Sequence, residues 1–306
     1  MAAIAAIYLS HLEKGDTVLL PMEAYGTTLQ LARSLSKFGV RVETAWPSAE
    51  KLAEAVKPST KLVLVETITN PLLRVIDVPS LAKCCEEAGV TLVVDNTFAT
   101  PVLYKPLKDG AKIVLHSATK YLSGHNDLIA GTLSSDEETI RQLWDWRRRL
   151  GTIMAPMEAY LLLRGLKTLE LRVKRHCENA QAVAEFLQDH PKVKQVHYPG
   201  LPDDEHHKTA TRILKGGYGG VVSFRVKGGK TEVKKLLNNL KTIKPAPSLG
   251  GPESLLTYPV ISASSTLSKE ERDRLGITED LLRLSVGLED LQDILEDLDQ
   301  ALNKIS

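Results

Sequence analysis

The sequence predicts an α/β protein with a large N-terminal domain, built on a mostly parallel sheet covered by helices, and a smaller C-terminal α/β domain. Three observations support this fold class. Short β-branched runs alternate with segments of helical period through the first half. Two of these runs, KLVLV and TLVVD, are almost continuously apolar, as expected of strands covered on both faces. Beyond residue 155 a long helical pattern replaces the strands.

The elements of the first domain follow from this alternation. The opening segment, MAAIAAIYLSHLEKGD, is expected to form an amphipathic helix. We expect strands at residues 17–21, 41–46, 61–68, 91–98 and 112–119, and helices at residues 28–38, 48–56 and 78–88. The runs at 61–68 and 91–98 should be central strands because they are the most apolar.

The junction between the two domains is expected within the helical pattern at residues 155–190. We place the boundary so that residues 1–175 form the N-terminal domain and residues 176–306 the C-terminal domain. In the second domain we expect strands at 193–199, 219–226 and 281–286, and helices at 232–241 and 288–305. Pro245, Ala246 and Pro247 form a stiff linker that leads to Ser248.

Composition narrows the classes of function. The 306 residues include 39 basic and 38 acidic side chains spread along the chain, and the net charge is +1. This charge distribution predicts no basic surface that would bind nucleic acid or an anionic membrane. The longest apolar runs are too short to cross a bilayer. The cysteines at 84, 85 and 177 lack the spacing of a disulfide framework or a metal site, and no leader precedes the first helix. A cytoplasmic protein with a small-molecule partner is expected.

Polar residues follow three of the predicted parallel strands, at residues 66–70, 95–97 and 116–120. Open α/β sheets bind ligands beyond the carboxyl ends of their strands. A lysine there (Lys120), flanked by hydroxyl residues and near a strand-end aspartate (Asp95), suits pyridoxal 5'-phosphate (PLP). The lysine forms the Schiff base, the acid pairs with the pyridinium nitrogen, and hydroxyls bind the phosphate. Taken singly, Lys120 is more simply a surface lysine and Asp95 a solvated or capping residue. Their combination favours the cofactor site.

The run VVDNTFATP followed by HSATKYLSGHNDLIAG resembles the signature of the PLP-dependent Cys/Met-metabolism (trans-sulfuration) family. That family includes cystathionine γ-synthase, the cystathionine lyases and methionine γ-lyase. MAAIAAI, AYGTT, ETITNPLL, SLGGPESLLTYP and LLRLSVGLED occur in the family order and cover nearly the whole chain. The resemblance implies an aspartate-aminotransferase-like fold (fold type I), PLP as cofactor, and a homodimer or homotetramer.

The resemblance also implies roles around the cofactor. Lys120 would bind it and shuttle protons, Asp95 would bind the pyridine nitrogen, and Tyr25 would stack on the ring and act as acid or base at the leaving group. The last role requires nearby positive charge, because a phenol otherwise keeps its proton at neutral pH. A core aromatic is the simpler interpretation of Tyr25. Further cofactor contacts are implied for Ser117, Thr119, Met1 and Asn70. Loop or helix capping is the alternative for the two hydroxyls.

On the substrate side, the resemblance makes Arg283 the residue that binds the α-carboxylate, a task suited to a planar bidentate donor. Asn70 and Ser248 match residues beside the cofactor oxygen and that carboxylate. Glu253 matches an acid at the substrate entrance in family members that handle cystathionine. Turn or cap formation is the alternative for these last three residues.

Two departures from the family pattern bear on activity. The family has a further N-terminal segment with a Tyr-x-Arg pair that reaches the neighbouring subunit's phosphate site. This sequence starts within a family motif at Met1, so we expect weakened cofactor affinity. Thr27 stands where methionine γ-lyases carry a cysteine, and Ser264 stands at a histidine position. Both argue against methionine γ-lyase.

The sequence therefore predicts a PLP-dependent enzyme that performs γ-replacement or γ-elimination on a sulfur amino acid or an activated homoserine, of cystathionine γ-synthase or γ-lyase type. Methionine γ-lyase, O-acylhomoserine sulfhydrylase, a non-catalytic PLP-fold protein and an aminotransferase of the same fold type are the alternatives. The charged run at residues 203–207 is interpreted as a solvated loop, because it lacks further ligands at helical spacing. No metal is expected.

Overall fold

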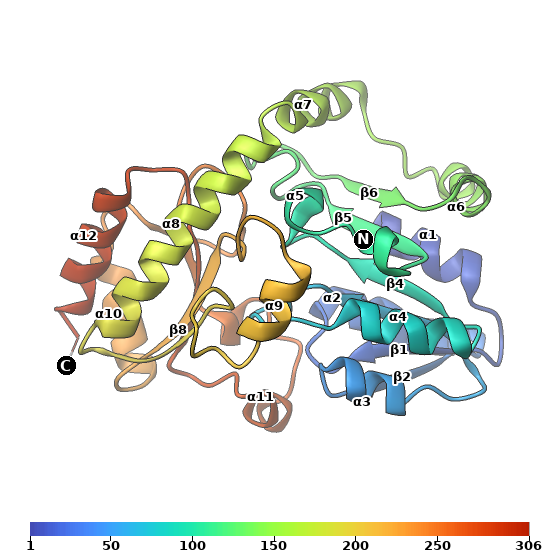
Figure 1. Cartoon of the computed structure of the whole chain (residues 1–306), viewed down its shortest axis with the longest axis horizontal. Coiled ribbons are helices and arrows are strands. Elements are labelled where there is room, and N and C mark those ends of the chain that lie inside the picture. The colour runs from blue at the N-terminus through green and yellow to red at the C-terminus, as the bar shows by residue number, and fades with distance from the viewer. Residues whose placement is uncertain (306) are drawn as a thin grey trace.

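The computed structural model describes residues 1–305, which form two α/β lobes side by side (Figure 1). The first lobe is built on a six-stranded sheet of order β2-β1-β3-β4-β5-β6. Its strands are β1 (Thr17–Pro21), β2 (Arg41–Ala45), β3 (Thr60–Glu66), β4 (Thr91–Asp95), β5 (Ile113–Ser117) and β6 (Gly131–Ser134). Neighbours pair in parallel except for β6, which is antiparallel to β5. The predicted α/β fold with a mostly parallel sheet is confirmed.

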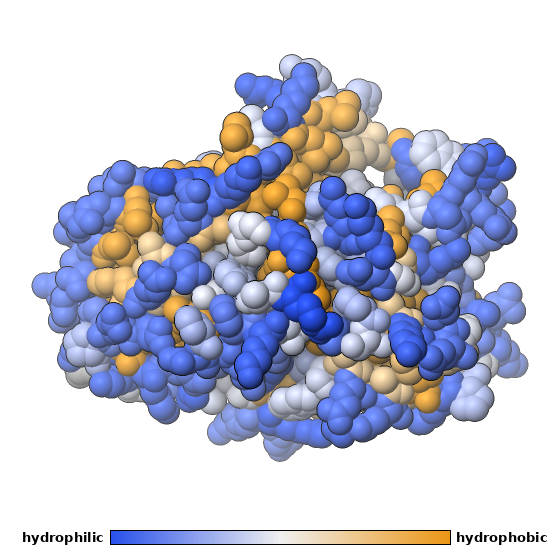
Figure 2. All heavy atoms as spheres, in the orientation of Figure 1, coloured by the Kyte–Doolittle hydropathy of each residue, from blue (hydrophilic) through white to orange (hydrophobic). Residues whose placement is uncertain are grey.

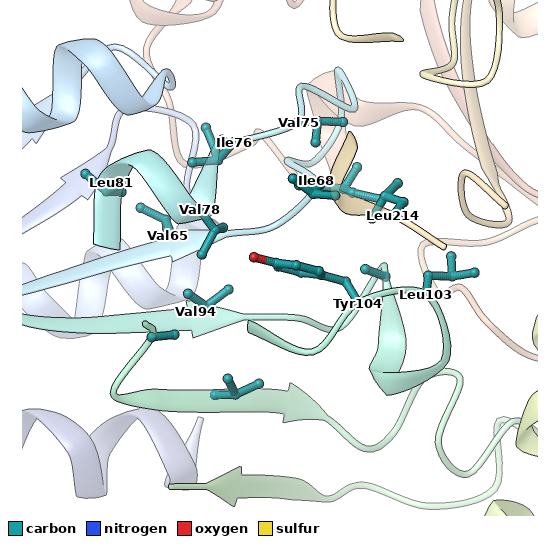
Figure 3. Packing of buried hydrophobic residues seen from close by; sticks show 14 of the residues in the cluster. Val65, Ile68, Val75, Ile76, Val78, Leu81, Val94, Leu103, Tyr104 and Leu214 are labelled. Carbon is teal, nitrogen blue, oxygen red and sulfur yellow. The ribbon is translucent and has the colours of Figure 1, made fainter. Parts of the chain in front are cut away.

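Helices cover both faces of this sheet, as the two apolar central strands require. Val63 and Val65 of β3 pack into one cluster with α4 (Val78–Glu87), whereas Leu62 and Leu64 pack into another with α1 (Ala2–His11) and α2 (Gly26–Ser34). Successive strand residues point to opposite faces, so a strand buried on both faces must be apolar at nearly every position. Figure 3 shows the first cluster, in which Val65 and Val94 face the side chains of α4.

The first helix differs from its prediction in one respect. Residues 2–11 are helical, but Ile4, Ala6, Ile7 and Tyr8 are all buried, which places apolar side chains around most of the helix rather than along one stripe. The helix packs against α2, β6 and α6 (Glu137–Leu150). The prediction of an amphipathic helix is therefore wrong, because α1 is covered on several sides.

The second lobe contains a five-stranded sheet of order β7-β8-β11-β10-β9. Its strands are β7 (Val193–His197), β8 (Val221–Val226), β9 (Lys244–Pro245), β10 (Leu255–Thr257) and β11 (Leu281–Ser285). All pairings are antiparallel except that of β9 with β10. The remaining helices are α3 (Ala49–Glu54) and α5 (Thr100–Leu103) in the first lobe, and α9 (His207–Ile213), α10 (Lys230–Asn239), α11 (Lys269–Leu275) and α12 (Leu291–Leu302) in the second.

Two helices join the lobes, α7 (Pro156–Leu166) and the long α8 (Leu169–Asp189). Figure 1 shows α8 running from α7 toward the C-terminal lobe. Val173 and Cys177 of α8 belong to the core of the first lobe, and Ala180 and Leu187 to that of the second. The proposed boundary between residues 175 and 176 lies inside this shared helix and stays a prediction. No helix within residues 1–305 is long and apolar enough to span a membrane.

Candidate active site

The carboxyl ends of β3, β4 and β5 lie next to one another at one edge of the parallel sheet. Asp95 pairs with Glu66 of β3 on one side and with Leu115 of β5 on the other. The loops that follow these strands therefore begin side by side, as the sequence predicted. The loop after β3 carries Asn70, and the loop after β5 carries Lys120.

Asp95 is held at the end of β4 by its own loop. Its Oδ1 accepts hydrogen bonds from the backbone N–H of Thr97, at 3.0 Å, and from the Thr97 hydroxyl. The same hydroxyl accepts a bond of 2.8 Å from the backbone N–H of Ser117, which links β4 to β5. Burial raises the pKa of Asp95, and the hydrogen bonds from Thr97 oppose that rise. A cation beside this carboxylate would be stabilised more than in water, because little solvent screens the charges.

Lys120 lies in a tight turn directly after β5. Its backbone N–H donates to the carbonyl of Ser117 (3.1 Å), and its carbonyl accepts from Gly124 (2.8 Å). The amine, Nζ, donates to the hydroxyl of Ser248 at 3.2 Å. Burial, and then the positive charge of Arg283, lower the pKa of the Lys120 amine. Both causes favour the neutral amine, which is the nucleophilic form.

Arg283, in β11, is a buried guanidinium with only 1% of its surface exposed. Its acceptors are all uncharged: Asn70 Oδ1 at 2.9 Å, and the oxygens Pro247 O at 3.0 Å, Ser248 O at 3.1 Å and Thr257 Oγ1 at 3.2 Å. Its Nε is buried without a hydrogen-bond partner among the described residues. Burial lowers the pKa of Arg283 to about 10. A buried cation without an anionic partner is costly, and a ligand carboxylate would supply that partner.

The structure thus brings together four residues that are far apart in the sequence. Ser248 contacts Lys120 through its hydroxyl and Arg283 through its carbonyl, and Asn70 contacts Arg283 through its side chain. The predicted grouping of these residues around one site agrees with this geometry. Their individual roles stay proposals.

Tyr25 lies at the start of α2, where its backbone N–H donates to Glu66 Oε1 at 2.9 Å. Its side chain is 47% exposed. A core aromatic, the simpler interpretation from sequence, is therefore wrong. The ring is available at the same edge of the sheet as Asp95, because Glu66 and Asp95 are register partners.

The carboxyl group of Glu66 is a buried neighbour of the site that sequence reasoning did not single out. Burial, and then the charge of Asp95, raise the pKa of Glu66 well above its ordinary value. Glu66 holds the loop of Tyr25 through the hydrogen bond just described. The signal that identifies it in the sequence is an acid placed at the end of an otherwise apolar strand, KLVLVE.

The remaining predicted residues surround this centre. The Thr119 hydroxyl accepts from the backbone N–H of Ala130 at 3.0 Å, so it braces the Lys120 turn against the segment that leads to β6. Met1 precedes α1, and its amino group is one of the groups that lower the pKa of Asp95, after the hydrogen bonds from Thr97. Glu253 accepts a hydrogen bond of 2.9 Å from the side-chain amide of Asn126.

This donor set fits PLP rather than a metal ion. It combines a partly buried amine of lowered pKa, a partly buried strand-end carboxylate, an exposed aromatic ring, hydroxyls and an unpaired guanidinium Nε. Within residues 1–305, no three or more His, Cys, Asp or Glu side chains form a group that could hold a metal.

Comparison with known proteins gives a consistent result. The sequence model of the family described as "Cys/Met metabolism PLP-dependent enzyme" matches residues 1–303. The chain is 43% identical to the L-methionine gamma-lyase of Fusobacterium nucleatum subsp. polymorphum over 310 residues, which is 100% of this chain and 78% of that protein. It is 43% identical to the cystathionine gamma-lyase of Sus scrofa over 97% of this chain and 75% of the relative.

A solved structure of similar fold is the cystathionine gamma synthase from Xanthomonas oryzae pv. oryzae in complex with aminoacrylate and cysteine. It superposes with a TM-score of 0.96 at 41% sequence identity, covering 99% of this chain and 79% of the other. Sequence and structure therefore point to the same group of enzymes.

Proposed function

Because this chain belongs to the family of Cys/Met metabolism PLP-dependent enzymes, we propose that it performs γ-replacement or γ-elimination on a sulfur amino acid or an activated homoserine. The cofactor of the family is PLP. One observation supports the proposal above all: a lysine of lowered pKa and a buried arginine with only neutral acceptors share Ser248. An amine for a cofactor aldehyde and a cation for a substrate carboxylate are thus held side by side.

We assign the cofactor contacts as follows. Lys120 would hold the aldehyde group through its amine, Asp95 the ring nitrogen through its carboxylate, and Tyr25 the face of the pyridine ring. Ser117, Thr119 and the backbone at Met1 would bind the phosphate, and Asn70 would bind the ring oxygen. When bound, PLP supplies an electron sink that makes the carbon-bound protons of an amino acid more acidic.

The chain's own residues then bind the substrate and move its protons. Arg283 binds the α-carboxylate through its guanidinium, whose rigid fork fixes the orientation of the amino acid. Burial and then the charge of Arg283 lower the pKa of Lys120 Nζ, which takes the proton from the substrate Cα. The hydroxyl of Ser248 orients Nζ during this transfer. The hydroxyl of Tyr25 donates a proton to the leaving group.

We favour a cystathionine γ-synthase or γ-lyase type over a methionine γ-lyase type. The two sequence departures, Thr27 and Ser264, support this choice because their segments meet beside Tyr25. A Cβ added to Gly26 would lie 2.3 Å from the hydroxyl of Thr266, so these segments are in close contact. Differences in the side chains that line a substrate site change the relative binding free energies of competing substrates by a few kcal/mol. This suffices to select one substrate over another.

The central assignment is tested by cofactor binding. Purified protein incubated with PLP should develop the visible absorbance of a lysine-bound cofactor, and Lys120→Ala should abolish it. Lys108→Ala, which removes an exposed lysine outside the site, should leave the absorbance unchanged. Persistence of the normal absorbance in Lys120→Ala would overturn the assignment.

The reaction type is tested by product analysis. With L-cystathionine, a γ-lyase releases a 2-oxo acid, ammonia and cysteine. With an O-acylhomoserine and cysteine, a γ-synthase forms cystathionine. A folded, PLP-loaded protein that converts neither substrate would contradict the proposed function and favour a non-catalytic PLP-fold protein. A 2-oxo acid formed while the amine stays on the cofactor would indicate an aminotransferase.

We further propose that the enzyme is a homo-oligomer, either a dimer or a dimer of dimers. Large apolar side chains are exposed on α7 and the beginning of α8, where Figure 2 shows apolar residues gathered at the top of the molecule. This apolar row comprises Met157, Tyr160, Leu163, Leu166 and Leu171. Monomeric proteins rarely leave such a row open to solvent, and a second copy of the chain would cover it.

A cytoplasmic location is proposed on the chemistry of the cysteines. Cys84, Cys85 and Cys177 are all free thiols. Burial raises the pKa of Cys177 to about 11, which keeps that thiol protonated and unreactive. Free thiols fit a reducing compartment.

A further inference from the structure

The turn that contains Lys120 (residues 118–124) packs against the corner where α7 ends and α8 begins. Arg172, near the start of α8, reaches from this corner into the turn. Its Nη1 donates to the carbonyl of Tyr121 at 2.8 Å, and its Nη2 donates to the carbonyl of Leu122 at 3.5 Å. These two residues directly follow Lys120. The guanidinium therefore fixes the backbone next to the residue that carries the reactive amine.

The guanidinium of Arg172 is itself held by the corner. Its Nη2 also donates to the carbonyl of Gly165 at 2.7 Å, and its Nε donates to the hydroxyl of Thr168 at 3.0 Å. Arg172 is only 7% exposed, its four acceptors are uncharged, and burial lowers its pKa. A buried cation without an anionic partner is costly for stability. The rigid fork of an arginine can, however, hold two backbone segments at once.

Two glycines allow the turn to approach the corner this closely. A Cβ added to Gly124 would lie 1.8 Å from Nη1 of Arg172, and the φ of Gly124 is 70°, which glycine adopts without steric cost. A Cβ added to Gly165 would lie 2.3 Å from the carbonyl oxygen of Ser123. The turn and the corner are thus in direct contact, so a displacement of one displaces the other.

The same face of α8 also holds the segment that follows Arg283. His176 lies four positions beyond Arg172, a spacing that places both side chains on one face of the helix. The Nδ1 of His176 donates to the carbonyl of Val286 at 2.7 Å, just beyond the end of β11. One helix face therefore fixes the backbone beside Lys120 and the backbone beyond Arg283.

We propose that Arg172 is a positioning residue for Lys120. By fixing the carbonyls of Tyr121 and Leu122, it holds the Lys120 amine beside Ser248, where the amine takes the Cα proton of the substrate. This inference rests on the proposed function and deepens it. Arg172 acts through the backbone of the turn and does not contact the reacting atoms.

A displaced turn changes the Lys120 amine in two ways. It separates Nζ from the Ser248 hydroxyl, now at 3.2 Å, and it lets water reach the amine. Proton transfer slows, because its rate depends on the position of the catalytic group. The pKa of Lys120 rises toward its ordinary value, because burial is the main cause that lowers it. Substrate affinity is kept, since Arg283 binds the α-carboxylate independently of the turn.

The first test measures proton transfer with L-norleucine, an amino acid that has no leaving group. The PLP-loaded enzyme is placed in heavy water, and NMR follows exchange of the norleucine Cα proton. Arg172→Lys keeps the positive charge and removes the fork. We expect it to slow the exchange about 10-fold, because a misplacement of about 1 Å costs up to about 100-fold. The dissociation constant of norleucine, measured by calorimetry, should stay at the wild-type value.

The second test needs no turnover. Protein free of PLP is mixed with PLP, and the rate at which the visible absorbance of the lysine-bound cofactor appears is measured against pH. The midpoint of this profile follows the pKa of the Lys120 amine, because only the neutral amine reacts. Arg172→Lys should move the midpoint to higher pH. A loss of stability alone would leave the midpoint in place.

Arg225→Lys is the matched control, because it removes the fork of another partly buried arginine, whose Nε lies 3.0 Å from Asp280. It should keep the wild-type exchange rate and midpoint. Unchanged values in Arg172→Lys, or equal changes in the two variants, would overturn the positioning role. If Arg172→Lys does not fold, Gly165→Ala decides, because it keeps Arg172 and pushes against Ser123. A wild-type exchange rate in Gly165→Ala would then overturn the role.

The wild-type enzyme separates a failure of this inference from a failure of the proposed function. If it forms no lysine-bound absorbance with PLP, or does not exchange the Cα proton of norleucine, the proposed function fails and the role of Arg172 fails with it. If it does both and Arg172→Lys behaves in the same way, only the role of Arg172 fails.

Discussion

Arg283 is the buried cation of the candidate site, and its neighbours contribute oxygens without negative charge. We expect Arg283→Lys to weaken substrate binding about 10-fold to 100-fold, because one charge-assisted hydrogen bond is worth about 1.5–3 kcal/mol. A lysine cannot reproduce the fork that holds a carboxylate. The dissociation constant of L-norleucine for the PLP-loaded variant, measured by calorimetry, checks this expectation.

Arg225 provides the control for this prediction. It lies in β8, adjacent to β11, and its Nε is 3.0 Å from the carboxylate of Asp280. Arg225→Lys should leave norleucine affinity unchanged and affect only stability. Equal losses of affinity in the two variants would show that Arg283 acts through the stability of the sheet and not through a substrate carboxylate.

The positions of single candidate residues were largely predictable from the sequence. Lys120 and Asp95 carry their identity in local motifs, and both lie at strand ends as expected. Tyr25 was misjudged when considered alone, because its exposure depends on how α2 begins beside Glu66. The roles of these residues remain predictions, and Lys120→Ala tests that of Lys120.

At the scale of elements, the carboxylate of Asp297 in α12 stabilises the turn that follows α10. It accepts hydrogen bonds from three consecutive backbone N–H groups: those of Lys241 and Thr242, each at 2.9 Å, and that of Ile243, at 2.8 Å. Asp297→Asn would turn an amide N–H₂ toward at least one of these donors. We expect the variant to lose about 1–3 kcal/mol in free energy of unfolding, the penalty for an unsatisfied buried group. Urea denaturation at neutral pH checks the value.

The pH dependence of this contact follows from its pKa. Burial raises the pKa of Asp297, but the hydrogen bonds from residues 241–243 outweigh that effect and lower it overall. Because the folded-state pKa lies below the unfolded value of about 4, the stabilisation is complete above that pH. It is lost as the pH falls through the folded-state pKa. The difference between the wild type and Asp297→Asn should therefore shrink in acid. Glu296→Gln, an exposed change on the same helix, should show no such difference.

Local sequence patterns predicted some helices and strands of the first lobe and missed others. The five parallel strands were predicted within a few residues, because apolar runs bounded by turns are a local signal. β6 and α6 were not predicted. β6 has four residues with no apolar run, and α6 buries only Thr139 and Leu143. Both lie at the edge of the first lobe, where little burial leaves little pattern.

At the scale of the whole molecule, the exposed row on α7 predicts association. Leu163 is 64% exposed and lies at the centre of the row. Leu163→Glu should place a charge in the interface and convert the oligomer to monomers, because a buried unpaired carboxylate costs several kcal/mol. Sedimentation velocity at micromolar concentration measures the outcome.

Phe38→Glu is the control for association, because Phe38 is equally prominent, at 71% exposed, but lies outside the row. It should leave the oligomeric state unchanged. A wild-type protein that sediments as a monomer would refute the assignment of this surface.

The sequence by itself determined the fold class, the succession of strands and helices in the first lobe, and the positions of Lys120 and Asp95 at or just after the ends of their strands. These depend on periodicity and on motifs a few residues long. The resemblance grouped distant side chains at one site, and only the tertiary structure gave the contacts among them. Arg283 meets Asn70 across 213 positions, Lys120 meets Ser248 across 128, and Asn126 meets Glu253 across 127. Such contacts depend on how two separate sheets pack around α8, and no local pattern encodes that arrangement.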